Sequence, residues 1–288
     1  MPDPSFDLGP KQAAGLTGKF VLYQVGLGVG IAGGSALVGA VLHLQGFAKT
    51  VTESPWALVV INTTAAALVL RVQLRRSHAT WGQLATWGAN WVSLLPFVVL
   101  LVLGEGILLS EFDNRVSVIL PRPDWVVEFS LRLVDLARHP IGAPFALVVM
   151  AAVTEEFLFR GLILRGLLAR FTPRRAIVVS AALFALMHMN PWQMPGAFLG
   201  GVVLGWVYFR TRSLALCICG HGFHNALSLF VPSLPFVIDG FNRPLAPGQI
   251  LFQPWWLDLL GLVLVGGGAF LFNRQAPVAA PAPSPPAA

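Results

Sequence analysis

Two adjacent carboxylates, Glu155 and Glu156, lie in the middle of a stretch, residues 144–160, that otherwise reads as a membrane-spanning helix. An ionised side chain at the centre of a bilayer costs about 2.5 to 3.5 kcal/mol, so residues of this kind usually face a polar interior and have a function. Glu156 and Arg160 are four residues apart and can neutralise each other on one helix face. Glu155 is turned about 100° away and has no partner in its own helix. We therefore predict that Glu155 is a free carboxylate, available as a base.

Two further apolar runs carry polar side chains at helical spacing. Phe184 and His188 are four residues apart and share one helix face, as do His221 and Asn225. His224 is offset by about 60° from His221 and can take its place. Taken alone, each pair fits a packed, hydrogen-bonded core as well as it fits a catalytic site.

The polar residues of the three helices have similar predicted depths in the membrane. Counted from the predicted cytoplasmic helix ends at about 1.5 Å per residue, Glu155 lies roughly 15 Å deep, His188 and Asn225 roughly 18 Å, and His221 roughly 12 Å. Independent structural residues have no reason to share a depth. The four side chains, from three spans, are therefore predicted to form one site.

The chemistry open to such a layer is the activation of water. A carboxylate and an imidazole can bind and deprotonate a water molecule, and a second imidazole with an amide can donate hydrogen bonds to an oxyanion. The sequence has no Gly-x-Ser-x-Gly turn, His-Glu-x-x-His helix or P-loop. Cys217 and Cys219, two residues apart, make neither a disulfide framework nor a zinc ribbon. Hydrolysis of a peptide bond by activated water fits best.

The composition indicates the kind of element that must hold this site. Of 288 residues, 56% are hydrophobic and only 11% are charged, whereas a soluble domain has about a quarter charged residues. The net charge of +6 comes from short Lys and Arg clusters between apolar runs and not from one basic face, so the partner is the lipid bilayer and not a nucleic acid.

Eight apolar runs reach or approach the length of about 20 helical residues that crosses a hydrocarbon core. They are residues 20–44, 55–70, 91–109, 143–164, 176–189, 195–209, 214–231 and 255–272. We predict an all-α, polytopic transmembrane helix bundle of about eight spans. Gly26, Gly30 and Gly34 share one face of the first run, which favours close helix packing there.

Basic residues recur at every second connection, which predicts that both termini are cytoplasmic. They are Lys11, Lys19, Arg71, Arg75, Arg76, Arg165, Arg170, Arg174, Arg175, Arg210, Arg212 and Arg274. The connections 111–139 and 232–254 are then exoplasmic. In the first of these, four polar residues recur at helical spacing opposite apolar ones, which predicts a helix lying in the membrane interface. They are Glu128, Arg132, Asp135 and His139.

The chain divides into five predicted parts. These are a cytoplasmic N-terminal segment (1–19), N-terminal transmembrane helices with the interfacial helix (20–142), a catalytic transmembrane core (143–231), an exoplasmic loop with the last helix (232–275), and a disordered Pro- and Ala-rich tail (276–288). The bias toward Ala, Gly, Pro and Arg is typical of a GC-rich bacterial genome, which predicts a bacterial plasma (inner) membrane.

Three motifs occur in order on successive helices: Glu155-Glu156-x-x-x-Arg160, Phe184-x-x-x-His188 and His221-x-x-x-Asn225. Together they resemble the CPBP family of intramembrane proteases, which includes the type II CAAX prenyl endopeptidases and the bacteriocin-processing and immunity proteins. The resemblance covers about residues 143–231. It implies that Glu156, Arg160 and Phe184 support the site.

The same resemblance assigns the catalytic roles. Glu155 and His188 would activate the water, and His221 with Asn225 would stabilise the tetrahedral oxyanion. The substrate would be a membrane-associated or lipidated protein or peptide, and the sequence does not fix whether it is prenylated.

Two alternatives stay open. Glu155, His188 and His221 can form a zinc site of two imidazoles and one carboxylate, but no local His-x-x-x-His spacing fixes it, so we expect no tightly bound metal cofactor. The same three residues would form a relay in a proton- or ion-coupled transporter. No internal repeat with paired broken helices supports a transporter.

Overall fold

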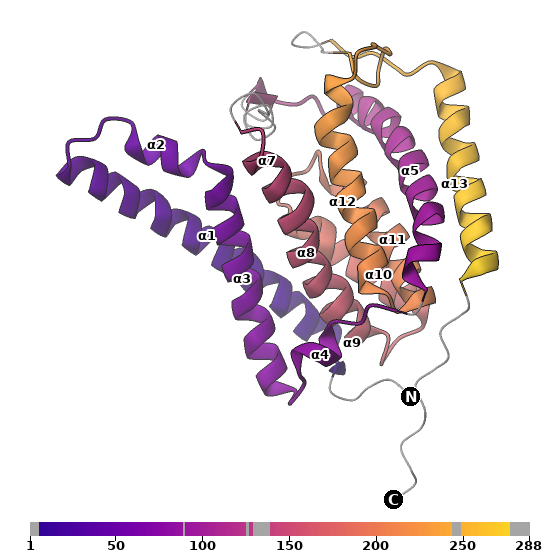
Figure 1. The fold of residues 1–288 in the computed structure, drawn as a ribbon, viewed down its shortest axis with the longest axis horizontal. Coiled ribbons are helices and arrows are strands. Elements are labelled where there is room, and N and C mark those ends of the chain that lie inside the picture. Colours follow the sequence, from indigo (N-terminus) through magenta and orange to yellow (C-terminus); the bar gives the residue numbers. More distant parts are fainter. Residues whose placement is uncertain (1–5, 89, 125–126, 129–138, 244–248, 277–288) are drawn as a thin grey trace, which may run out of the picture.

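The computed structural model describes residues 6–88, 90–124, 127–128, 139–243 and 249–276, and the regular elements in this part are helical. The first elements are α1 (Pro10–Val41), α2 (Phe47–Thr52), α3 (Pro55–Arg76), α4 (Trp81–Leu84) and α5 (Trp91–Ile119). In Figure 1, α1, α2 and α3 project to one side of the other helices, and we call these three the N-terminal arm. The predicted all-α fold is confirmed over the described residues.

The second half begins with an unbroken helical segment, residues 142–167, in which ordinary and wide π-helical turns alternate. Its parts are α7 (Gly142–Pro144), η2 (Phe145–Met150), α8 (Ala151–Glu156), η3 (Phe157–Leu164) and α9 (Arg165–Leu167). The chain continues through α10 (Pro173–Met187), α11 (Met194–Thr211), α12 (Leu214–Phe230), the short η4 (Val231–Ser233) and α13 (Trp255–Gln275). We call α5 together with α7–α13 the bundle.

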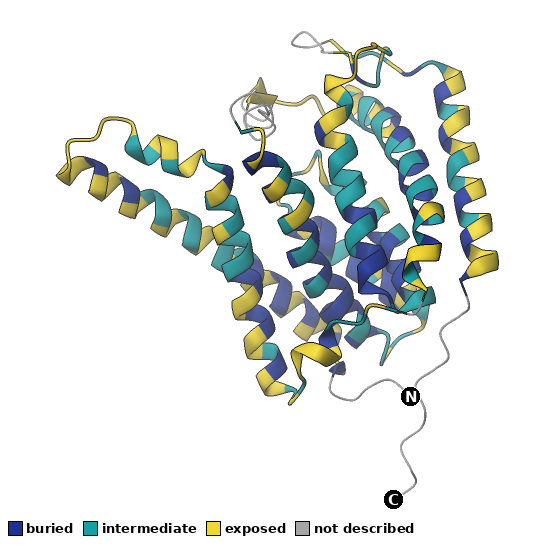
Figure 2. Ribbon diagram, in the orientation of Figure 1, coloured by how far each residue is buried: buried dark blue, intermediate teal, exposed yellow. Residues whose placement is uncertain are grey.

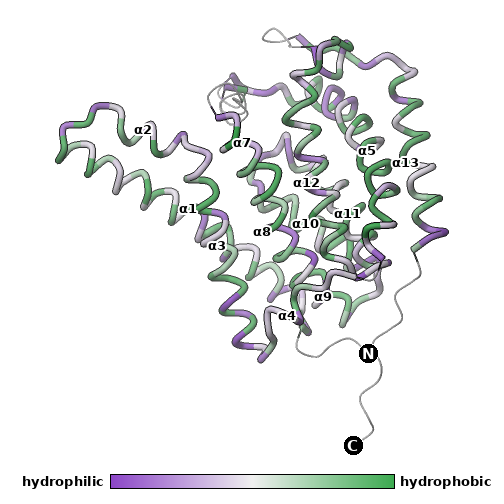
Figure 3. Tube along the Cα trace, in the orientation of Figure 1, coloured by the Kyte–Doolittle hydropathy of each residue, from purple (hydrophilic) through white to green (hydrophobic). Residues whose placement is uncertain are grey.

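Among the described residues, five helices are long and apolar enough to cross a membrane: α1, α3, α5, α12 extended by η4, and α13. This number supports a multi-pass membrane protein, and Figure 3 shows apolar residues along each of these helices. The predicted count of eight spans is not confirmed. The other three runs fall on residues 142–167, on the 15-residue α10 and on the 18-residue α11. Helix α10 stops early because Met189 takes a left-handed conformation, with φ of 49°.

Several helices carry basic residues in their last turns. Figure 1 shows that α1 begins and α13 ends at the same end of the molecule. Basic residues occupy the last turns of α3 (Arg75 and Arg76), α11 (Arg210) and α13 (Arg274). Which side of the membrane this end faces stays a prediction. The predicted interfacial helix lies mostly at residues 129–138, outside the described residues.

The helix pair α5 and α13 packs through glycines. A Cβ atom added at Gly104 would lie 2.6 Å from the carbonyl oxygen of Gly261, and one added at Gly268 would lie 2.7 Å from the backbone nitrogen of Leu101. The two backbones are therefore in direct contact, which no residue larger than glycine would allow at these positions.

The predicted packing of the glycine face on the first helix is wrong within this chain. Cβ atoms at Gly26, Gly30 and Gly34 would each meet nothing within 4 Å. The reason is that α1 is anchored mainly through its first turns, where residues such as Leu16 and Phe20 are buried, and its later part leaves the bundle. Figure 2 shows buried residues gathered in the bundle and exposed ones along the far part of the arm.

Candidate active site

A buried ionic group links four helical elements of the bundle: α8, η3, α11 and α12. Arg160 in η3 donates from Nη1 to Oε1 of Glu156 at 2.7 Å, and both side chains are almost fully buried, at 1% and 0% exposure. His221 on α12 donates from Nδ1 to the same oxygen at 2.8 Å. Arg160 also donates from Nη2 to the carbonyl of Gly201 on α11 at 3.3 Å. The sequence predicts the pairing of Glu156 with Arg160, and the structure adds His221 to it.

Glu155, the preceding residue, approaches this ionic group only at His221. Its Oε2 lies 3.8 Å from Nε2 of His221, and no other polar contact of its side chain is found among the described residues. The His221 ring therefore lies between two glutamates, with Nδ1 bonded to Glu156 and Nε2 facing Glu155. Two π-helical segments, η2 and η3, flank the short α8 that carries both glutamates, and π-turns of this kind often occur at functional sites.

His188 follows the last residue of α10 and is held by a bond to its own helix. Its Nδ1 lies 2.8 Å from the carbonyl oxygen of Phe184. A carbonyl oxygen only accepts hydrogen bonds, so Nδ1 carries the proton and Nε2 of the neutral ring presents a lone pair. The bond also satisfies a carbonyl at the helix end, a common role of histidine there.

Phe184 lies at the centre of the aromatic contacts. Its ring meets the rings of His188 and His221 edge to face, with centroids 5.0 and 5.7 Å apart. The guanidinium of Arg160 lies 4.7 Å from the centroid of the same ring, a distance at which a cation and an aromatic face attract each other. Phe184 thus contacts Arg160 and both imidazoles, which restricts their orientation.

Asn225 connects α12 by a hydrogen bond to η2, the segment that precedes Glu155 and Glu156. Its Nδ2 donates to the carbonyl of Leu147 in η2 at 2.8 Å, which leaves the second hydrogen of the amide nitrogen available. His224, the predicted substitute for His221, makes no ring hydrogen bond among the described residues. Nδ1 of His221 is bonded to Glu156, so His221 is the better positioned of the two.

All the predicted catalytic side chains meet at one cavity of about 850 Å³. Its lining includes Glu155, Phe184, His188, His221, His224 and Asn225. Glu156 and Arg160 are not among the lining residues, so they lie behind its wall. The side chains predicted to share one depth therefore line one cavity, and their depth in the membrane stays a prediction.

Comparison with known families identifies this part of the chain. Residues 137–227 match the family described as type II CAAX prenyl endopeptidase Rce1-like. The chain therefore contains an Rce1-like domain. The match agrees with the resemblance drawn from the three motifs, and it spans them all, from Glu155 to Asn225. No curated protein and no solved structure gives a significant match.

One residue of the cavity was missed by the sequence argument. Glu105 on α5 lies outside the Rce1-like domain, lines the cavity and is 7% exposed. Its Oε1 is buried without a hydrogen-bond partner. The signal was present, because Glu105 is a single carboxylate between Gly104 and Gly106 in an otherwise apolar run. It has no partner three or four residues away, so no local motif drew attention to it.

The residues of the Rce1-like domain that were considered as zinc ligands do not gather around one point. Among the described residues no group of three or more His, Cys, Asp and Glu side chains is placed to hold a metal ion. Glu155, His188 and His221 share a cavity but do not form such a group.

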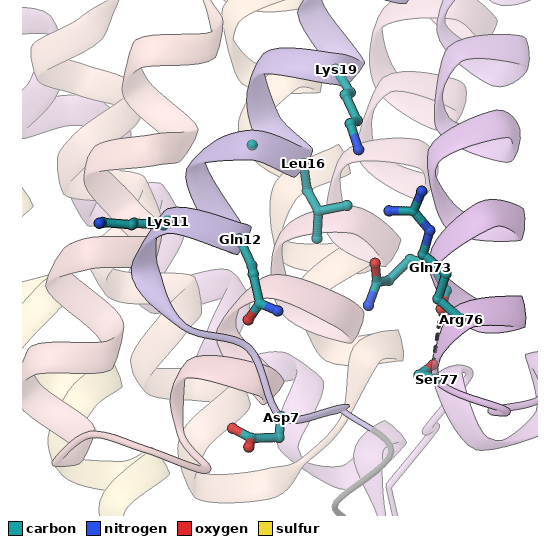
Figure 4. Close-up of a pocket in the computed structure, with 9 residues that line it drawn as sticks. Asp7, Lys11, Gln12, Leu16, Lys19, Gln73, Arg76 and Ser77 are labelled. Atoms are coloured by element: carbon teal, nitrogen blue, oxygen red, sulfur yellow. Dashed lines mark hydrogen bonds between the residues drawn. The ribbon is translucent and has the colours of Figure 1, made fainter.

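A second cavity, of about 500 Å³, lies outside the Rce1-like domain, between the ends of α1 and α3 that carry basic residues (Figure 4). Lys19 and Arg76 point into it, and its one acid, Asp7, is paired with Arg170. The hydrogen bond from Arg170 holds the pKa of the Asp7 carboxyl below its ordinary value. With no imidazole and no unpaired carboxylate, this cavity lacks the groups needed to activate water.

Proposed function

We propose that the protein is an intramembrane endopeptidase that hydrolyses a peptide bond of a membrane-associated or lipidated protein or peptide. The observation that carries the proposal is the meeting of Glu155, His188, His221 and Asn225 at one cavity inside an Rce1-like domain. A carboxylate and an imidazole can activate water, and a second imidazole with an amide can donate hydrogen bonds to the oxyanion.

Glu155 and His188 are the groups assigned to the water. Glu155 is ionisable, lines the cavity and has no hydrogen bond that would occupy it, so it can take a proton from a bound water. The lone pair on Nε2 of His188 can accept a second hydrogen bond from the same water, because Nδ1 is engaged by Phe184. The resulting hydroxide oxygen attacks the carbonyl carbon of the substrate.

His221 and Asn225 are the groups assigned to the oxyanion. When its ring is protonated, His221 donates from both nitrogens, to Glu156 through Nδ1 and into the cavity through Nε2. Asn225 has one amide hydrogen left after its bond to Leu147. Donors that are fixed before the reaction stabilise the developing negative charge most effectively.

Glu156 and Arg160 act on the site from behind the cavity wall. Oε1 of Glu156 accepts from both Arg160 and His221, which fixes the ring plane and the direction of Nε2. Partners of this kind, in contact with a catalytic group but not with substrate, set its orientation.

The family description points to a prenylated substrate that ends in a CAAX sequence. Much of the cavity away from the polar group is apolar, with Val102, Leu103 and Leu109 of α5 among its lining residues. Such a surface suits an alkyl or isoprenoid chain, because burial of apolar area stabilises binding.

The test is cleavage of a prenylated CAAX peptide by the full chain in detergent or nanodiscs, with products identified by mass spectrometry. We expect one new C-terminal carboxyl group and release of the residues that follow it, and slower cleavage of the same peptide without its lipid. No cleavage by folded wild-type protein of either peptide would overturn the proposal.

Metal dependence is decided in the same assay by a chelator titration and elemental analysis of the purified protein. We expect activity to persist without stoichiometric metal. A bound metal that tracks activity through removal and return would replace this mechanism with the zinc alternative.

A further inference from the structure

Glu105 lines the same cavity as Glu155 but from another wall. Glu155 belongs to α8 and Glu105 to α5, and Figure 1 shows α12, which carries His221, between these two helices. A peptide bond bound over His221 would therefore have one carboxyl group on each side.

The carboxyl group of Glu105 makes no hydrogen bond or ion pair that would explain its burial. It is 7% exposed, and no described residue donates a hydrogen bond to it or pairs with it. A Cβ atom at Gly200 of α11 would lie 3.6 Å from its Oε1, so glycine leaves room beside the carboxyl group. A buried polar group without a partner needs an explanation.

Burial without a hydrogen-bond partner favours the neutral acid form of Glu105. Glu105, Glu155 and Asp113 line the cavity, and Glu156 lies behind its wall. Two permanently charged cations lie near them: Arg122, which lines the cavity and is paired with Asp113, and Arg160. Nη1 of Arg160 is bonded to Glu156. A further ionised carboxylate in an apolar setting is strongly disfavoured unless it is paired, so such a group keeps its proton.

We propose that Glu105 is the general acid of the reaction, the group that gives a proton to the leaving nitrogen. This inference rests on the proposed function. Glu155 takes a proton from water as the hydroxide oxygen bonds to the carbonyl carbon. The carbon–nitrogen bond of the tetrahedral intermediate then breaks, and the nitrogen takes the proton of the Glu105 carboxyl group.

After this step Glu105 is ionised and Glu155 is protonated. Transfer of one proton from Glu155 to Glu105, through water in the cavity, restores both groups, and the net reaction is the addition of one water to one peptide bond. Two carboxyl groups in different environments, one acting as acid and one as base, are a recurring solution in hydrolytic enzymes.

The test compares two substrates of the same sequence, a prenylated peptide and its ester analogue in which oxygen replaces the leaving nitrogen. An alkoxide leaves without prior protonation far more readily than an amide anion does. In Glu105→Gln, which keeps the shape but has no acidic proton, we expect kcat for the peptide to fall about 100-fold. The ester should be cleaved at close to the wild-type rate. Glu105→Met, an apolar side chain of similar length, should show the same selective loss.

The outcomes separate this inference from the proposed function. Wild-type protein that cleaves neither substrate overturns the proposed function. If wild type cleaves both, peptide cleavage at the wild-type rate in Glu105→Gln overturns the acid role. Equal losses for peptide and ester would make Glu105 a positioning residue and would also overturn it.

A buried carboxylate on the same helix is the matched control. Glu111 accepts a hydrogen bond from the backbone of Gln253 at 2.8 Å and pairs with Arg115 at 2.7 Å, and it does not line the cavity. Glu111→Gln should lower the melting temperature and leave the ratio of peptide to ester cleavage unchanged. A change in that ratio would show that it does not report on Glu105.

Discussion

The N-terminal arm and the bundle use the same residue types in opposite ways. Gly26, Gly30 and Gly34 of α1 face open space, whereas Gly104 and Gly268 bring α5 and α13 into backbone contact. Lys19 and Arg76 of the arm point into an open cavity with no ion pair among the described residues, whereas Arg160 of the bundle is buried against Glu156. Polar groups gain defined geometry only where neighbouring helices hold them. This difference is the reason to place the chemistry in the bundle.

Loss of the buried ion pair of the bundle should have the largest effect on folding stability. Glu156→Ala and Arg160→Ala each strand a buried charge, so each should cost about 3 to 5 kcal/mol of folding free energy. The double variant should lose less than the sum of the two, because neither charge remains unpaired. Thermal unfolding of the four proteins in detergent measures the coupling. Additive losses would mean that the two residues do not act as a pair.

This pair also shows what sequence can predict and what it cannot. Glu156 with Arg160, and Phe184 with His188, are four residues apart, and helix geometry alone brings them together. The bond from His221 to Glu156 spans 65 residues, and the bond from Asn225 to Leu147 spans 78. These contacts depend on how whole helices pack, which periodicity does not encode.

Glu105 and the α1 glycines illustrate the same limit from two sides. Glu105 has no local partner, and its position in the cavity wall is seen only when α5 is packed against the Rce1-like domain. The glycine spacing on α1 was correct as a pattern, but the spacing does not say which face meets a neighbour. A pattern on one helix predicts which side chains share a face and not which neighbour that face packs against.

The next effect concerns catalysis. Asn225→Ala should lower kcat about 100- to 1000-fold, equivalent to about 2.7 to 4 kcal/mol, with little change in KM, because an oxyanion donor acts mainly in the transition state. Asn225 also bonds to Leu147, so the melting temperature must be measured beside the rate. A rise in KM at constant kcat would assign Asn225 to substrate binding instead.

A smaller effect compares the two sets of glycines directly. Gly268→Ala places a Cβ 2.7 Å from a backbone nitrogen and should cost about 1 to 3 kcal/mol through overpacking. Gly30→Ala meets nothing within 4 Å, and because alanine is the better helix former it should be neutral or stabilise by up to about 1 kcal/mol. Unfolding of both variants under one condition tests the contrast. Destabilisation of similar size at both sites would contradict it.

The central claim, that a free carboxylate in the bundle activates water for peptide hydrolysis, is tested most directly at Glu155. The measurement is the rate of cleavage of a prenylated CAAX peptide by wild type and by Glu155→Gln, taken together with the melting temperature of each protein. We predict that cleavage is abolished while the melting temperature is unchanged, because Glu155 makes no hydrogen bond that holds the fold together. Retained cleavage by folded Glu155→Gln protein would contradict the account.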